Sequence, residues 1–516
     1  MRGLLLLAMA LGCAAPRGAQ VARARYEADL APRLVPLLSE MLRFRTVKGD
    51  AEGHAAQKAW LLRAAAGLGL VGRDAGLVTE IELPGPPGAP VLGLLVHGDV
   101  QPVEPEGWTF PPFSGRVHAG HVWGRGAADD KGPLVQALLA MRAVSGLSRT
   151  HTIRLLVGSD EESDNEDIKT YLKAHAPPDY SLVLDSDFPV TVGEKAWDGF
   201  AVAARPAPDR KPHESWEVES MDAGLSPSIV PDRAALVLRW RSGEPRWGPL
   251  RDRLSKRALP EGTSLSMDER GASLALLVRG KAAHGGVNLE GGRNALVALA
   301  RLVEGELGQG GAGDLFAFAR LAGADRHGQA LRLQPPDPLW GGFTVNVATL
   351  KPSPLPPAHA SGPSTAKPAP AGGGFRLYVN LRRPPPMSAR QMSAHMESVL
   401  AEFNARTGAK LVRDGGYMED EPFVVDPRGK LVRRLLAAFE RGTGRAQDPV
   451  TSGGGTYAKR LPNAVAFGMW FRGAPYPGHD VDEKIPIADL HAGMHVLIEA
   501  LADLATGPRI DGPLAP

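Results

Sequence analysis

The chain has 516 residues, with 59 Lys and Arg against 57 Asp and Glu, and 43% of its residues are hydrophobic. This balance is typical of a globular protein and excludes a disordered chain, a collagen and a coiled coil. The net charge of +2 leaves no basic footprint, so we expect no nucleic-acid partner. The single cysteine excludes a disulfide framework and a cysteine-rich zinc site, so any metal ligands must be His, Asp or Glu.

Residues 1–20 have the pattern of an export signal. A positive charge at Arg2 precedes an apolar run at 4–11 that is shorter than the roughly 20 residues of a membrane span. Cys13 follows a small residue, where a lipoprotein signal places its acylated cysteine. We therefore expect an exported protein, periplasmic or anchored to a membrane by lipid at Cys13. An ordinary cleaved signal and a misassigned start of the chain are the alternatives.

The two ends of the chain predict one α/β domain. Amphipathic periodicity predicts helices, and short apolar runs between turn residues predict buried strands. The expected helices are residues 26–44, 55–68, 131–144 and 487–504, and the expected strands are 91–96, 153–158, 182–184 and 464–470. Because strands alternate with helices, we expect a mostly parallel sheet to which residues 21–197 and 425–516 both contribute.

The middle of the chain, residues 198–424, has a different pattern. Alternating apolar and polar residues predict strands at 234–240, 273–278, 344–350 and 375–381, with a helix at 294–307. We therefore expect an α+β domain inserted into the first one. Residues 351–374 are rich in Pro, Ala, Ser and Gly with almost no large apolar residues, which predicts a flexible loop.

Polar clusters follow the predicted strands directly, at the place where an open α/β sheet binds its ligands. They are residues 97–99 (HGD), 124–132 (GRGAADDKG), 159–163 (SDEES), 184–187 (LDSD) and 477–480 (PGHD). Taken alone, the first four are explained at least as well by a solvated turn or a helix cap. Together they would crowd several carboxylates and two histidines at one edge, which suits a pair of divalent ions.

These clusters also carry a resemblance. HGDV, GRGAADDKG, DEES, the Asp185 turn with GEK at 193–195, GGGTY at 453–457 and the His479 loop resemble, in this order, the zinc aminoacylase and dipeptidase family. That is the ArgE/DapE type of metallopeptidase, which includes aminoacylases and glutamate carboxypeptidases. DDKGP with the GEK segment is most similar to the PepV-type dipeptidases. The resemblance covers nearly everything after residue 20 and implies a zinc-exopeptidase catalytic domain with an inserted lid.

The resemblance implies a site with two zinc ions. By similarity, His97 and Asp185 bind the first ion, Glu162 and His479 bind the second, and Asp129 bridges both. Asp99 would orient His97. Glu161 would remain free as the general base that takes a proton from water and delivers it to the leaving amine.

The lid and the glycine loop supply the implied substrate contacts. In GKAAHG at 280–285, His284 would stabilise the tetrahedral oxyanion. In VNLRRP at 379–384, Arg382 resembles the arginine that holds a substrate carboxylate, with Arg383 as the alternative. Gly455 and Thr456 would contact the substrate.

Two positions depart from the family pattern. Ser228 stands where the lid commonly has Asn, and no glycine follows the paired glutamates, because Asp164 comes after Ser163. The resemblance implies a dinuclear zinc metallopeptidase that cleaves dipeptides and other small peptides. The lid is long enough to close the site within one chain, so we expect a monomer. An N-acyl amino acid deacylase or a carboxypeptidase is the alternative enzyme, and a surface binding lipoprotein without turnover is the alternative of another class.

Overall fold

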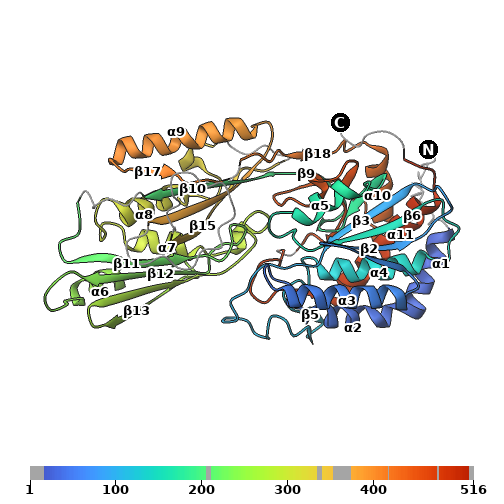
Figure 1. Cartoon of the computed structure of the whole chain (residues 1–516), viewed down its shortest axis with the longest axis horizontal. Helices are drawn as coiled ribbons and strands as arrows, with labels where there is room; N and C mark the ends of the chain where they lie inside the picture. Colours follow the sequence, from blue (N-terminus) through green and yellow to red (C-terminus); the bar gives the residue numbers. More distant parts are fainter. Residues whose placement is uncertain are drawn as a thin grey trace, which may run out of the picture.

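The computed structural model describes residues 17–204, 211–333, 340–352, 374–416, 418–473 and 476–510. It has two lobes arranged end to end, each built on its own large sheet (Figure 1). Cys13 and the apolar run of the predicted signal lie outside the described residues, as do residues 353–373 of the predicted flexible loop. None of the helices in the described ranges combines the length and apolarity that a membrane span requires.

The first lobe, the catalytic lobe, contains a nine-stranded sheet in the order β1-β2-β6-β3-β7-β20-β9-β18, with β19 also paired to β9. Its central strands β6, β3, β7 and β20 are parallel, and antiparallel pairs flank them on both sides. This confirms the predicted α/β class with a parallel centre. The strands are β1 (Val71–Ala75), β2 (Val78–Leu83), β3 (Val91–His97), β6 (Thr152–Gly158), β7 (Tyr180–Val183), β9 (Thr191–Glu194), β18 (Phe423–Val424), β19 (Val450–Ser452) and β20 (Ala464–Ala466).

Two predicted elements of this lobe are interrupted. The helix expected at 26–44 is divided into a π-helical turn, Tyr26–Leu30, and α2 (Ala31–Met41). Pro32 lies in the first turn of α2, and a proline suits that position because it has no N–H to donate to a preceding turn. The strand expected at 464–470 is divided into β20 and β21 (Met469–Trp470), and Gly468 between them has a φ of 67°.

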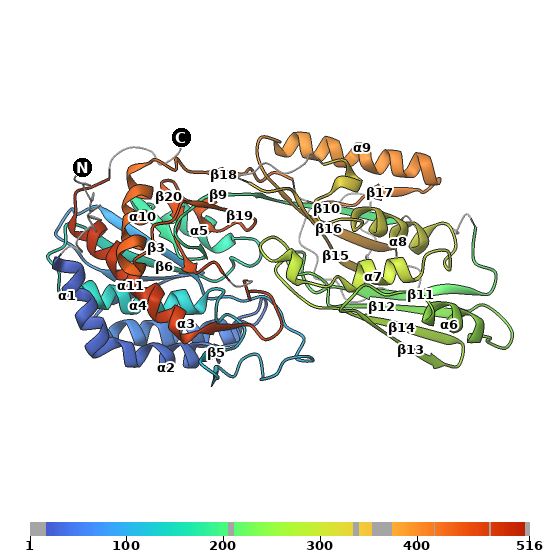
Figure 2. The ribbon, with the colours of Figure 1, turned by 180° about the vertical axis from the view of Figure 1, so that it is seen from behind.

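Helices cover the catalytic sheet: α1 (Arg17–Arg25), α2, α3 (Ala51–Gly67), α4 (Lys131–Val144), α5 (Glu166–Ala174), α10 (Lys430–Thr443) and α11 (Ile487–Thr506). The predicted 131–144 helix coincides with α4, which is buried along almost its whole length. Seen from behind, α11 lies beside α1 and α4 (Figure 2). Helix α11, near the C-terminus, therefore packs into the same hydrophobic core as the helices near the N-terminus.

A small three-stranded sheet joins distant parts of this lobe. β5 (His121–Trp123) pairs with both β4 (Arg116–His118) and β22 (Lys484–Pro486). The loop that contains Asp129 follows β5, and the loop that contains His479 precedes β22. This pairing places both loops at the same end of the lobe.

The second lobe, the lid, is an eight-stranded antiparallel sheet in the order β13-β14-β12-β11-β15-β16-β10-β17. The chain enters it through β10 and rejoins the catalytic sheet at β18, and the lid has a hydrophobic core of its own. Its strands are β10 (Ala196–Ala204), β11 (Trp216–Ala223), β12 (Arg233–Trp240), β13 (Ser264–Arg270), β14 (Ser273–Arg279), β15 (Thr344–Pro352), β16 (Phe375–Arg383) and β17 (Leu411–Arg413); its helices are α6 (Gly248–Ser255), α7 (Ala295–Leu302), α8 (Gly311–Ala322) and α9 (Ala389–Thr407).

Candidate active site

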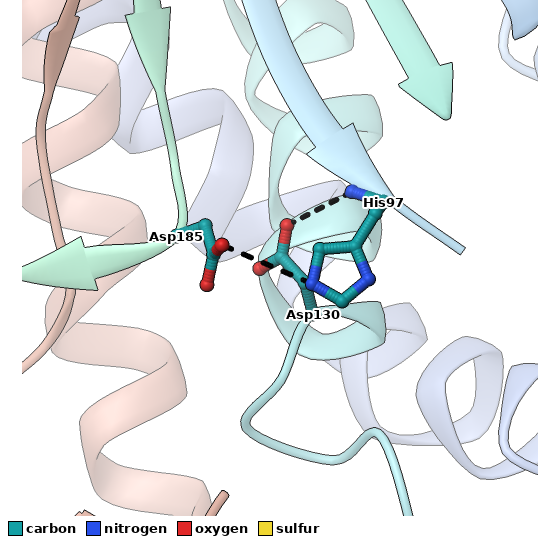
Figure 3. Close-up of side chains that lie close together, drawn as sticks. All are labelled: His97, Asp130 and Asp185. Atoms are coloured by element: carbon teal, nitrogen blue, oxygen red, sulfur yellow. Dashed lines mark hydrogen bonds and ion pairs between the residues drawn. The ribbon is translucent and has the colours of Figure 1, made fainter. Parts of the chain in front are cut away.

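The carboxyl ends of the central strands bring the first group of polar side chains together. His97 is the last residue of β3, Asp185 follows the neighbouring β7, and Asp130 immediately precedes α4 (Figure 3). The Asp130 carboxylate accepts a hydrogen bond from the His97 backbone N–H at 3.1 Å, and His97 Nε2 lies 3.8 Å from Asp185 Oδ2. Parallel strands end at one edge of their sheet, which explains why residues 88 positions apart can meet there.

Asp129 lies between two histidines. Its Oδ1 is 3.0 Å from His97 Nε2, and its Oδ2 is 3.3 Å from His479 Nε2. His479 Nε2 is also 3.0 Å from both carboxylate oxygens of Glu162. One carboxylate that presents a different oxygen to each histidine has the arrangement of a ligand shared by two metal ions.

Two groups of side chains could each hold a metal ion. They are His97 with Asp130 and Asp185, and His97 with Asp129 and Glu162, with the potential ligand atoms of each group within 4.8 Å of one another. The predicted ligands therefore come together. The structure adds Asp130, to which the sequence had assigned no role, although its position beside Asp129 in the DDKG cluster was the available signal.

The electrostatics of this cluster fit a bound cation. Desolvation and neighbouring acids hold the pKa of Asp130 and of Asp185 well above the usual range. Asp129 behaves in the opposite way: despite its desolvation, hydrogen bonds from His479 and His97 hold its pKa well below the usual range. Asp130 Oδ1 is buried and has no hydrogen-bond partner among the described residues. Crowded acids and an unpartnered oxygen are what a divalent ion would neutralise.

Asp99 braces the turn that carries the paired glutamates. Its carboxylate accepts hydrogen bonds from the backbone N–H groups of Glu161, at 3.2 Å, and Glu162, at 3.0 Å. The backbone carbonyl of Asp99 lies 3.0 Å from His97 Nδ1, and its carboxylate lies 3.6 Å from the same atom. Asp99 thus touches the ring of His97, where the sequence expected it, and also fixes the turn of Glu161.

His284 reaches the site from the loop that follows β14. Its Nδ1 accepts hydrogen bonds from the backbone N–H groups of Gly286, at 3.0 Å, and Val287, at 2.9 Å. Desolvation, with nearby His479 and Arg382, holds the pKa of His284 well below its usual range, so the ring is neutral. A neutral imidazole that accepts at Nδ1 carries its proton on Nε2. His284 stacks on His479, with ring centroids 4.3 Å apart, and offers the Nε2–H as a donor.

Arg382 and Arg383 lie on opposite faces of β16, because side chains alternate along a strand. Arg382 lines a cleft between the lobes, and its Nε donates to Asn380 Oδ1 at 3.2 Å. Desolvation lowers the pKa of Arg382 to about 10, which leaves it charged at neutral pH. Arg383 is fully buried and forms an ion pair at 2.7 Å with Asp198, which is also fully buried. The geometry therefore assigns Arg382 to the cleft and Arg383 to the interior of the lid.

The comparison with protein families is decisive at this point. The model for peptidase family M20/M25/M40 matches residues 93–503, which include all the site residues described above. The chain belongs to this family. It is therefore a metal-dependent hydrolase, as the sequence motifs predicted.

Curated relatives of this M20 peptidase include YtjP of Bacillus subtilis (strain 168), whose name makes it a candidate dipeptidase. It is 29% identical over 421 residues, which are 81% of this chain and 84% of YtjP. A Staphylococcus haemolyticus protein with the same kind of name is 25% identical over 425 residues, 81% of this chain and 83% of its own.

Solved structures share the fold. Human carnosine dipeptidase 1 superposes with a TM-score of 0.58 at 13% identity, covering 95% of this chain and 99% of its own. The di-peptidase Dug1p of Saccharomyces cerevisiae gives 0.58 at 14% identity, covering 94% and 98%.

A second brace of the glutamate turn was not foreseen from the sequence of this M20 peptidase. One oxygen of the fully buried Asp167 accepts hydrogen bonds from the backbone N–H groups of Ser159, at 2.7 Å, and Asp160, at 2.8 Å, and from the Tyr457 hydroxyl. A Cβ at Gly158 would lie 1.9 Å from that hydroxyl oxygen, so this position needs glycine. Asp167 therefore holds the backbone just before the two glutamates in place. It does so although the turn lacks the glycine expected after them from the resemblance.

The glycine loop forms part of the cleft wall. Thr456 and Gly455 both line the cleft, as expected. The Thr456 hydroxyl donates to one carboxylate oxygen of Glu194 at 2.7 Å, and the Thr456 backbone N–H donates to the other at 3.0 Å. Both the hydroxyl proton and the backbone N–H of Thr456 are thus used within the wall.

The cleft has a volume of about 890 Å³ and is bounded by both lobes. A smaller cavity of about 50 Å³ adjoins it, and Glu161, Glu162, His284 and His479 line both spaces. Ser228, the departure from the family pattern, also lines the cleft; its Oγ accepts a hydrogen bond from Trp197 Nε1 at 3.2 Å. The four side chains that line both spaces therefore lie where the cleft meets the small cavity.

Proposed function

We propose that this M20 peptidase is a dinuclear zinc dipeptidase. The observation that carries the proposal is the position of Asp129 between His97 and His479, with Glu161 beside them and His284 stacked above. The names of the curated relatives, and of the solved dipeptidases that share the fold, support a peptide substrate of this length.

The donor set suits two zinc ions. His97, Asp129 and Asp185 would hold one ion, with Asp130 as the further acid within reach, and Asp129, Glu162 and His479 would hold the other. Nitrogen and carboxylate oxygen ligands without cysteine are common at catalytic zinc sites. When bound, the ions supply Lewis acidity and lower the pKa of coordinated water toward neutrality.

Glu161 is the carboxylate best placed to act as the general base. It lines both the cleft and the small cavity, and its carboxylate has no hydrogen-bond or ion-pair partner among the described side chains. Its backbone is fixed by Asp99, so the carboxylate is held in place while its oxygens stay open. It would take a proton from the attacking water and return it to the leaving amine.

The lid would complete the reaction with two contacts. The Nε2–H of His284 would donate to the oxyanion that forms at the attacked carbonyl. Arg382 would pair with the carboxylate at the C-terminus of the dipeptide, for which a planar guanidinium is well suited. We also propose that the protein acts as a monomer, which the stacking of His284 on His479 within one chain supports.

The pattern of residues 1–20 supports a further proposal, that the protein acts outside the cytoplasm. Arg2, the apolar run and Cys13 are the observations on which export and a lipid anchor rest. Labelling of the expressed chain with a radioactive fatty acid, compared with Cys13→Ser, tests the anchor. Equal label in both proteins would exclude it.

The experiment that tests the function measures amino acid release from free dipeptides and from N-acetylated dipeptides, with chelator and with added zinc. The proposal predicts chelator-sensitive cleavage of the free dipeptides and none with Glu161→Gln. Cleavage of only the blocked substrates would instead identify an N-acyl amino acid deacylase or carboxypeptidase. Two bound metal ions without turnover of either set would identify a binding protein.

A further inference from the structure

The wall that the lid contributes to the cleft presents aromatic rings beside Arg382. Trp197 in β10 pairs directly with Arg382 in β16, and directly opposite residues of an antiparallel pair share a face of the sheet. Tyr378 lies four residues before Arg382 on the same strand and hence on the same face. Both aromatic residues line the cleft, and their ring centroids are 6.3 Å apart. Trp197 is thus the cross-strand neighbour of Arg382, and Tyr378 lies farther along the same face of β16.

The aromatic wall is fixed and is extended by further apolar groups. The hydrogen bond from Trp197 Nε1 to Ser228 Oγ holds the indole in position. Leu225 and Pro227 line the same cleft, and Leu225 keeps 37% of its surface exposed. An apolar part of a ligand in the cleft would cover this side chain and remove it from water.

The lysines and arginines that line the cleft give little support for an acidic side chain on the substrate. Lys459 pairs with Asp420 at 2.7 Å, and Arg460 lies 3.8 Å from the same carboxylate. Lys169 pairs with Glu166 at 3.0 Å, and Lys48 pairs with Asp164. An acidic substrate side chain would have to compete with each of these carboxylates. Arg382 differs, because its terminal nitrogens have no carboxylate within ion-pair distance among the described residues.

We propose that Trp197, Tyr378 and Leu225 form a subsite for the side chain of the C-terminal residue of the substrate. This inference rests on the proposed function, in which Arg382 holds the C-terminal carboxylate. The side chain of the same residue would then extend along the face of the lid sheet that carries Trp197 and Tyr378. The enzyme prefers dipeptides whose C-terminal residue is large and apolar, such as Phe or Leu, over those that end in Gly or Glu.

The test compares kcat/KM of the full chain for Ala-Phe, Ala-Leu, Ala-Gly and Ala-Glu, with zinc present. Filling an apolar subsite raises kcat/KM by about tenfold or more, so Ala-Phe and Ala-Leu exceed the other two substrates. Trp197→Ala lowers the ratio of Ala-Phe to Ala-Gly by about tenfold, whereas Trp197→Phe keeps most of it because an aromatic face remains. Leu225→Ser, at an exposed position outside the lid core, lowers the same ratio by about threefold.

Trp240→Ala is the matched control. Trp240 belongs to β12 of the same lid and does not line the cleft, so its loss leaves the ratio as in the parent chain. An unchanged ratio in both Trp197→Ala and Leu225→Ser, with zinc content intact, overturns the subsite. A preference of the parent chain for Ala-Glu also overturns it. Failure to cleave any of the four substrates, Ala-Gly included, overturns the proposed function and the subsite with it.

Discussion

On the catalytic wall of the cleft, buried carboxylates hold the backbone of the turns that carry the proposed ligands and base, whereas the lid wall leaves donors open. Asp99 accepts two backbone N–H groups, and the fully buried Glu483 accepts those of Ala128 and Asp129 while it pairs with Arg125 at 2.8 Å. On the lid wall, the guanidinium of Arg382 makes one hydrogen bond, from Nε, to the residues that the structure describes. Changes on the catalytic wall should therefore abolish turnover or metal binding, and changes on the lid wall should alter substrate use.

The largest expected effect is on the catalytic wall. Glu161→Gln removes the proposed base and should lower kcat by about 10²- to 10⁴-fold, while zinc content stays the same. The measurement is dipeptide cleavage together with metal analysis of the dialysed protein. Glu162→Gln is the control, because it should lose zinc as well. Equal loss of zinc in both variants would show that Glu161 is a ligand and not the base.

The two adjacent arginines sharpen the comparison within the lid. Arg383→Ala leaves the fully buried Asp198 without its partner and should reduce the free energy of unfolding by about 3–5 kcal/mol. Arg382→Ala should instead raise KM for dipeptides with little change in stability. Urea denaturation and steady-state kinetics on both variants measure these effects. The assignment is wrong if the two variants exchange these outcomes.

His284→Ala tests the donor that the lid provides. Removal of one oxyanion donor should lower kcat by about 10²- to 10³-fold without release of zinc. His284→Asn, which retains an N–H donor, should recover part of the rate. A loss confined to KM in the alanine variant would contradict the oxyanion role.

The smallest expected effect concerns the brace below the glutamate turn. Tyr457→Phe removes one of the hydrogen bonds to Asp167 and should reduce the free energy of unfolding by about 1–3 kcal/mol, since the acceptor is a carboxylate. It should also lower kcat slightly, because the turn that carries Glu161 loses one support. Thermal unfolding measures the stability, and steady-state kinetics measure kcat. If both values equal those of the parent chain, Tyr457 does not support the turn.

The sequence predicted the parts of the site that depend on local chain order. Polar residues at strand ends were sufficient to bring His97, Asp129 and Asp185 together, because parallel strands share one edge. The resemblance singled out Asp129 as the shared ligand. The spacing of adjacent acids alone could not show that Asp129 faces both histidines while Asp130 receives the His97 N–H, since this depends on the loop before α4.

Long-range pairing explains what the sequence left open. Strand alternation separates Arg382 from Arg383, but only the pairing of β16 with β10 shows which of the two faces the cleft. The bond between Asp167 and Tyr457 joins residues 290 positions apart and has no local signature. Strands β11 and β13 and helices α8 and α9 of the lid were not predicted. β13 has only two apolar residues, Leu265 and Met267, and continues into the charged run Asp268–Arg270, so its alternation is too short to predict a strand.

Zinc titration of the metal-free chain, followed by release of amino acids from Ala-Phe, tests the central claim most directly. The account predicts that cleavage rises until two zinc ions are bound per chain, and that Glu161→Gln binds the same two ions without cleavage. Full cleavage by the metal-free chain, or two bound ions without cleavage in the parent chain, would contradict it.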